Sequence, residues 1–183
     1  MSIKVFFRYE YLYQYCFIAF FVRLYGCGNS QNPTRITPNT DTSLSGKNNL
    51  SMLINGKEWT ADNNIFGAFH PKGYNKPILI SGSKGKKDKN EQTFNINLFN
   101  ADGSGTFIFS NGNKDLNVAQ LGNLSADNYL CGSIMGYEMK VIVTKTSLDP
   151  VIVEATFEGK MTCPTGETLN ITRGAFYYNE NNF

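Results

Sequence analysis

From residue 50 to the C-terminal end, apolar side chains alternate with polar ones in short runs that Gly, Asn and Pro interrupt. Alternation with a period of two residues predicts half-buried antiparallel strands, and no run has the 3.6-residue period of a long amphipathic helix. The run 151–161 is the clearest, because Val153, Ala155 and Phe157 fall on one face and charged or hydroxyl side chains fall on the other.

Turn signals divide these runs. Asn55-Gly56 separates the runs 50–54 and 57–60, and it is a strong two-residue hairpin signal because both residues tolerate a positive φ. Residues 111–128 have no clear period and predict a long irregular connection. Further runs with strand alternation are 65–70, 77–81, 137–146 and 169–177, the last with a bulge expected at Gly174.

The run 93–99 alternates three apolar residues with Asn95 and Asn97, which predicts a strand buried on one face. A Gly-rich turn leads from it into the run 106–110. Consecutive strands joined by a turn usually pair, so we expect these two runs to be hairpin partners.

About eight or nine short strands predict an all-β domain that buries one face of every strand. An antiparallel β-sandwich and a closed, lipocalin-like β-barrel both satisfy this pattern. We favour the sandwich, because barrels that enclose ligands usually alternate over longer strands.

The charge distribution bears on the partners of this domain. The chain has a formal net charge of +2. The first 27 residues already have a net charge of +2, from Lys4, Arg8, Arg23 and Glu10. The remaining 14 basic and 14 acidic residues therefore cancel. A neutral body lacks the basic face that nucleic-acid binding normally requires, so we expect no nucleic-acid partner.

Residues 1–27 have the pattern of a secretory signal peptide, with basic residues before an apolar stretch that is too short to span a membrane. The end of this segment, Leu24–Cys27, resembles the lipobox of bacterial lipoproteins. In that family, a small residue before the cysteine admits the signal peptidase, and the thiol receives diacylglycerol. Gly26 and Cys27 match these positions, whereas Tyr25 is larger than usual and Arg23 adds a charge.

This resemblance implies a lipid anchor on Cys27 and a place in the bacterial cell envelope, facing the periplasm or the exterior. Simple secretion and an intracellular protein with an apolar N-terminus are the alternatives. Residues 28–49 are polar and rich in Ser, Thr, Asn and Pro, which predicts a disordered tether. We therefore expect a signal peptide over 1–27, a tether over 28–49 and a β-sandwich domain over 50–183.

The chain has four cysteines, and we expect them to have different chemical roles. Cys16 would leave with the signal peptide and Cys27 would carry lipid, so Cys131 and Cys163 remain. Cysteines in an oxidising compartment commonly pair, and we expect a disulfide between them. Neither has a neighbouring CxxC partner and the chain has one histidine, so metal-ligand spacing is absent and we expect no metal or cofactor.

Three short motifs suggest a relationship. Residues 55–61 read Asn-Gly-Lys-Glu-Trp-Thr-Ala, residues 156–159 read Thr-Phe-Glu-Gly, and residues 171–176 read Ile-Thr-Arg-Gly-Ala-Phe. The chain thereby resembles a group of uncharacterised small bacterial envelope lipoproteins that share "NGKxWxA", "TFxG" and "ITxGxF". The resemblance implies an exported β-sandwich-like domain and brings no catalytic residue with it.

Trp59, Tyr177 and Tyr178 are candidates for contact with a ligand or partner, although Trp59 beside a hairpin is also typical of a core residue. No Ser/His/Asp or Cys/His constellation is visible, so we expect no enzyme. The leading hypothesis is a non-catalytic binding or adaptor module that meets another envelope protein. A protein that binds a small apolar ligand or glycan is the first alternative, and an envelope hydrolase or hydrolase inhibitor is the second.

Overall fold

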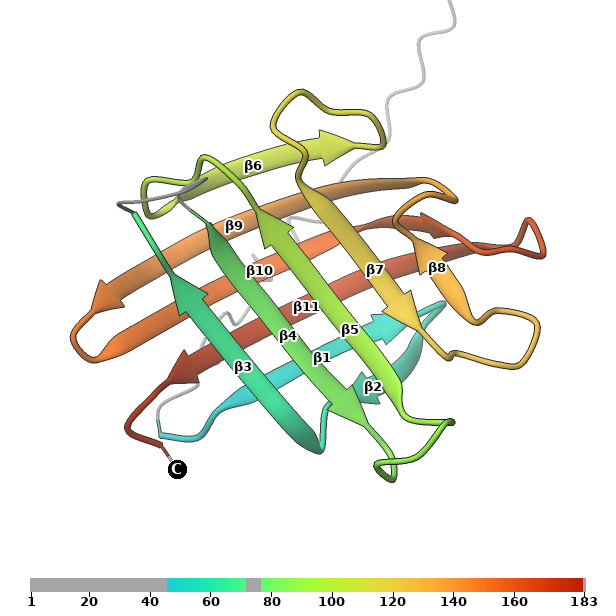
Figure 1. Cartoon of the computed structure of the whole chain (residues 1–183), viewed down its shortest axis with the longest axis horizontal. Helices are drawn as coiled ribbons and strands as arrows, with labels where there is room; N and C mark the ends of the chain where they lie inside the picture. Colours follow the sequence, from blue (N-terminus) through green and yellow to red (C-terminus); the bar gives the residue numbers. More distant parts are fainter. Residues whose placement is uncertain (1–45, 72–76, 183) are drawn as a thin grey trace, which may run out of the picture. The chain divides into compact units, whose positions relative to one another are not determined.

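Figure 1 shows two antiparallel sheets packed face to face in the computed structural model, which describes residues 46–71 and 77–182. These residues form eleven strands and no helix. Sheet A has the order β2 (Lys57–Thr60), β1 (Asn49–Ile54), β11 (Thr168–Asn179), β10 (Val151–Thr162), β9 (Tyr137–Leu148) and β6 (Gly105–Ser110). Sheet B has the order β3 (Asn63–Phe69), β4 (Ile78–Lys84), β5 (Gln92–Leu98), β7 (Val118–Gly122) and β8 (Leu130–Gly132).

The all-β sandwich predicted from the sequence is confirmed. The two sheets are hydrogen-bonded separately and do not close into the alternative barrel. The described residues contain two strands more than the upper estimate of nine, because β7 forms within the predicted irregular connection 111–128 and the short β8 follows it.

The expected hairpin between the runs 93–99 and 106–110 is wrong. β5 pairs with β4 and β7 in sheet B, whereas β6 pairs with β9 in sheet A, where Phe107 lies opposite Val141. The connection between β5 and β6 crosses from one sheet to the other, and its Ala101 is fully buried. A turn motif shows where the chain reverses, but it does not decide which sheet the next strand joins.

The predicted hairpin at the start of the domain is present. β1 and β2 pair in register across Asn55 and Gly56, which have φ values of 49° and 78°. Such positive φ angles match the twist of the flanking strands, and Gly adopts them without steric strain. The side-chain oxygen of Asn55 also accepts a hydrogen bond from the Asn170 backbone N–H at 2.8 Å, which ties the turn to β11.

Aromatic side chains from both sheets meet in the core. Phe94 of β5 stacks on Phe157 of β10 with ring centroids 5.2 Å apart, and Trp59 of β2 lies 6.1 Å from Phe94. Burying such large apolar rings is the main source of stabilisation in a sandwich of this kind.

The bulge expected near Gly174 is also present. The pairing of β10 with β11 shifts register where Glu158 faces Thr172 and Arg173, and Arg173 has a φ of 51°. A Cβ atom on Gly174 would collide with the ring of Phe157. Gly174 therefore leaves space for a central core residue.

A disulfide joins the two sheets. Cys131 lies in β8 of sheet B and bonds to Cys163, which directly follows β10 of sheet A. Both residues are buried. This confirms the expected pair, and closing a loop of this size is worth about 3–4 kcal/mol in the chain-entropy account.

The described residues belong to one compact unit, Asp41–Phe183. Its first strand begins at Asn49, one residue before the predicted start of the domain. The predicted signal peptide, the lipid-bearing Cys27 and nearly all of the predicted tether lie outside the described residues. Within the described part, no helix has the length and apolarity needed to cross a bilayer.

Candidate functional site

Two of the three aromatic candidates do not lie at the surface. Trp59 is 3% exposed and its indole Nε1 donates a hydrogen bond to the Gln92 side-chain oxygen at 2.8 Å. Tyr178 is 6% exposed. These two side chains pack in the core, whereas Tyr177 is half-buried on β11.

Tyr178 nevertheless supports an exposed aromatic residue that the sequence reasoning missed. Its ring contacts Phe66 of β3 edge to face, with centroids 5.8 Å apart. Phe66 is 48% exposed. Burial raises the pKa of Tyr178, and the nearby Glu180 carboxylate raises it further, so this phenol stays neutral beside the Phe66 ring.

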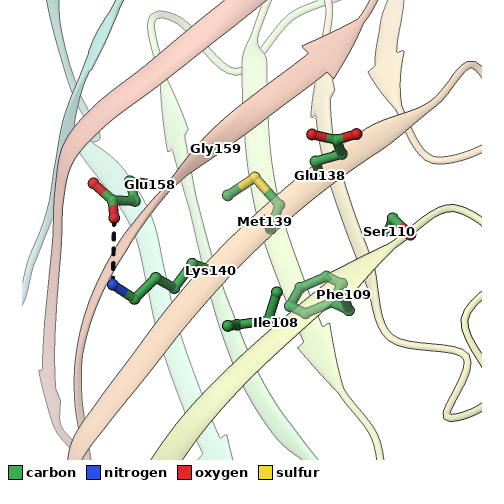
Figure 2. Close-up of a pocket in the computed structure, with 8 residues that line it drawn as sticks. All are labelled: Ile108, Phe109, Ser110, Glu138, Met139, Lys140, Glu158 and Gly159. Atoms are coloured by element: carbon green, nitrogen blue, oxygen red, sulfur yellow. Dashed lines mark ion pairs between the residues drawn. The ribbon is translucent and has the colours of Figure 1, made fainter.

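The first candidate site is a groove beside the edge of sheet A, which we call the β6 groove (Figure 2). It has a volume of about 420 Å³. The side chains that define it come from three neighbouring strands, β6, β9 and β10: Ile108, Ser110, Glu138, Lys140 and Glu158.

Gly159 forms part of the floor of the β6 groove (Figure 2). A Cβ atom at this position would collide with the Glu138 carbonyl oxygen and lie 2.6 Å from the Met139 sulfur. The absence of a side chain thus allows β9 and β10 to approach closely. A larger residue at position 159 would require β9 and β10 to move apart.

The charges in the β6 groove partly neutralise one another. Lys140 Nζ lies 3.6 Å from Glu158 Oε1, as the dashed line in Figure 2 marks, and the two side chains are 44% and 62% exposed. An ion pair this exposed contributes little to stability. Both groups can therefore turn to a ligand with little loss, and the exposed Ile108 adds an apolar contact beside them.

A second hollow of about 470 Å³ lies at the end of the same strands, next to Tyr137. The Tyr137 hydroxyl donates to the Asn117 carbonyl oxygen at 2.6 Å. Burial raises the pKa of Tyr137, and a hydrogen bond from Asn113 partly opposes that effect. The phenol is thus held neutral in a structural hydrogen-bond network.

A third hollow covers the outer face of sheet B and has a volume of about 410 Å³. We call it the amide face. None of the described residues that line it is ionisable, and its polar side chains are carboxamides and hydroxyls. The residues that define it are Phe66, Ser81, Thr93, Asn95, Asn97 and Gln120.

The two sheets differ sharply in charge. Among the described strands, those of sheet B contain one charged residue, Lys84 at the end of β4. The strands of sheet A contain nine, which are Lys57, Glu58, Glu138, Lys140, Lys145, Glu154, Glu158, Lys160 and Arg173. The absence of charge is therefore a property of sheet B and not of the whole molecule.

The described residues contain no cluster of three His, Cys, Asp or Glu side chains close enough to hold a metal ion. His70 is exposed just after β3.

No protein-family model, no curated protein and no solved structure matches this chain. Its function therefore has to be inferred from the fold and from the chemistry of these surfaces.

Proposed function

We propose that this protein is a binding module of the bacterial cell envelope, tethered to a membrane through a lipid on Cys27, and that it performs no catalysis. The observation that carries the proposal is the buried Cys131–Cys163 disulfide. Structural disulfides persist in oxidising compartments and are rare in the cytosol. An exported domain is the setting in which such a bond forms.

The segment Leu24–Cys27 supports the tether, because it resembles a lipobox and precedes a polar stretch. A single acyl chain binds membranes only marginally, whereas a diacylglycerol group supplies two chains and a stable anchor. The resemblance of the strand motifs to envelope lipoproteins is consistent with the same location.

Binding is supported by the surfaces of the domain. The core is filled by side chains from both sheets, whereas the β6 groove and the amide face are hollows of a size that accommodates small ligands or short polymer segments. The side chains that line these hollows are held by rigid strands. Such a frame presents a fixed contact surface and needs little ordering on binding.

The test is metabolic labelling of the full chain with a fatty-acid analogue, together with membrane fractionation, for the wild type and Cys27→Ser. We expect the wild type to be labelled and membrane-bound, and the variant to lose both properties. Cys16→Ser is the matched control and should keep both. An unlabelled wild-type chain that stays in the aqueous fraction with its N-terminus intact would refute the tether.

A second candidate function, glycan binding, is favoured by the uncharged lining of the amide face.

A further inference from the structure

We propose that the amide face of sheet B binds a neutral carbohydrate chain. The inference rests on the proposed function, because it names the ligand class and the surface of the same binding module. It begins with the cross-strand register. Phe66 pairs with Ser81, Ser81 with Asn95, and Asn95 with Gln120, so four strands contribute side chains to one row.

A neighbouring row lies two residues further along the strands. There Asn97 stands between Leu79 and Val118. Adjacent strands lie about 4.8 Å apart, and residues two positions apart along a strand are separated by about 7 Å. The amide face is therefore a regular array of side chains in which carboxamides and hydroxyls lie beside apolar residues (Figure 1 shows β3, β4, β5 and β7 side by side).

The carboxamides of this array are available to a ligand. Asn95, Asn97 and Gln120 make no side-chain hydrogen bond to any other residue that the structure describes, and each is partly exposed. A carboxamide offers two donor hydrogens and an acceptor oxygen. Sugar hydroxyls likewise donate and accept, so each amide can engage a hydroxyl in either sense.

Phe66 supplies the apolar contact at one end of the row. A sugar ring has a face of C–H groups, which packs well on an aromatic ring. The edge-to-face contact with the buried Tyr178 holds the Phe66 ring in place, although the ring is nearly half exposed. An aromatic residue fixed before binding loses little entropy when the ligand arrives.

The lack of charge selects a neutral ligand. A carboxylate, sulfate or phosphate on this face would lose water without gaining a cation, and such desolvation is strongly unfavourable. Lys84 is the one charged residue in the described strands of sheet B, and it does not line the hollow. The many carboxamides and hydroxyls of the lining also differ from the centre of a protein interface, where aromatic and Arg anchors dominate.

The test uses the full chain extracted from membranes and an array of neutral and acidic oligosaccharides, followed by affinity gel electrophoresis in mannan, xylan, β-1,3-glucan and alginate. We expect neutral glycans to bind. Asn95→Asp and Phe66→Ala should each weaken binding at least tenfold. Asn170→Asp and Leu148→Ala change exposed residues of sheet A that line neither hollow, and as matched controls they should bind like the wild type.

Thermal unfolding of each variant shows whether the fold is retained, and Gln120→Glu replaces Phe66→Ala if that variant does not fold. Three results would overturn the inference: no binding to any neutral glycan, binding confined to alginate and other acidic glycans, or binding that survives both Asn95→Asp and the second variant. Each of these contradicts recognition by the amide face.

Different experimental results would refute the glycan ligand and the proposed membrane tether. A photo-crosslinker at position 95 that captures an envelope protein, with no glycan bound, leaves the binding module intact and refutes the glycan. The opposite result is also possible: the chain carries no lipid on Cys27, yet it binds a glycan and Asn95→Asp weakens that binding. It refutes the tether and supports the inference.

Discussion

Phe94 of sheet B stacks on Phe157 of sheet A with their rings inclined by 19°, so a single pair of aromatic residues spans the interface between the sheets. Phe94 is 1% exposed and Phe157 is 3% exposed. Removing either ring would leave a cavity that rigid strands on both sides cannot close.

We predict that Phe94→Ala lowers the free energy of unfolding by about 3–5 kcal/mol, the range typical of large-to-small changes in a packed core. Urea denaturation followed by tryptophan fluorescence measures this, because Trp59 lies beside Phe94. Ile108→Ala, which changes a residue 78% exposed, is the control and should shift stability by less than about 0.5 kcal/mol. Equal effects of the two variants would contradict the packing described.

The disulfide leads to a second prediction. Replacing Cys131 and Cys163 together by Ala should destabilise the domain by about 3–4 kcal/mol, since the unfolded chain regains the freedom of the closed loop. Dithiothreitol should lower the urea midpoint of the wild type and leave that of the double variant unchanged. Two free thiols titrating in the denatured, unreduced protein would show that the bond does not form in the cell.

Two glycines should differ in their tolerance of a methyl group. Gly56 has a positive φ and no atom within 4 Å of a built Cβ, so Gly56→Ala should cost about 1 kcal/mol from backbone strain alone. At Gly159 a Cβ meets the Glu138 carbonyl oxygen, so Gly159→Ala should cost about 3 kcal/mol. Thermal or urea unfolding decides the order, and a reversed ranking would mean that β9 and β10 are further apart than described.

Much of the strand pattern could be predicted from the sequence, because each of nine runs with a period of two overlaps a strand of the structure. β7 could not, since it is short and lies among turn residues. β7 becomes a strand because β5 offers it a free edge, with Asn95 opposite Gln120. Local alternation carries no information about that pairing.

The same reasoning explains why the candidate site was only partly visible. Alternation placed Asn95 and Asn97 on the exposed face of one strand, which the structure confirms. Their neighbours Ser81 and Gln120 come from other strands, and only the register aligns them. Phe66 was missed because its exposure depends on β3 lying at the edge of sheet B, which the sequence of this run does not reveal.

Tyr137 leads to a prediction about pH. Burial raises the pKa of this phenol above its ordinary value of 10.0, so the unfolded chain releases the proton at a lower pH than the folded protein does. The stability that this group contributes is therefore complete below about pH 10 and is lost as the pH rises through the folded pKa. We expect the free energy of unfolding to fall in that alkaline range.

Tyr137→Phe removes this titration and also one hydrogen bond. At neutral pH the variant should lose only about 1 kcal/mol, because the Asn117 carbonyl oxygen keeps a second donor, the Asn113 amide at 2.8 Å. Above pH 10 the difference in the free energy of unfolding between variant and wild type should become smaller. Urea midpoints measured from pH 7 to pH 11 test both statements, with Tyr129→Phe, a change at a residue 56% exposed, as the control. A gap that stays constant across this range would show that the Tyr137 hydroxyl is as accessible to water in the folded protein as in the unfolded chain.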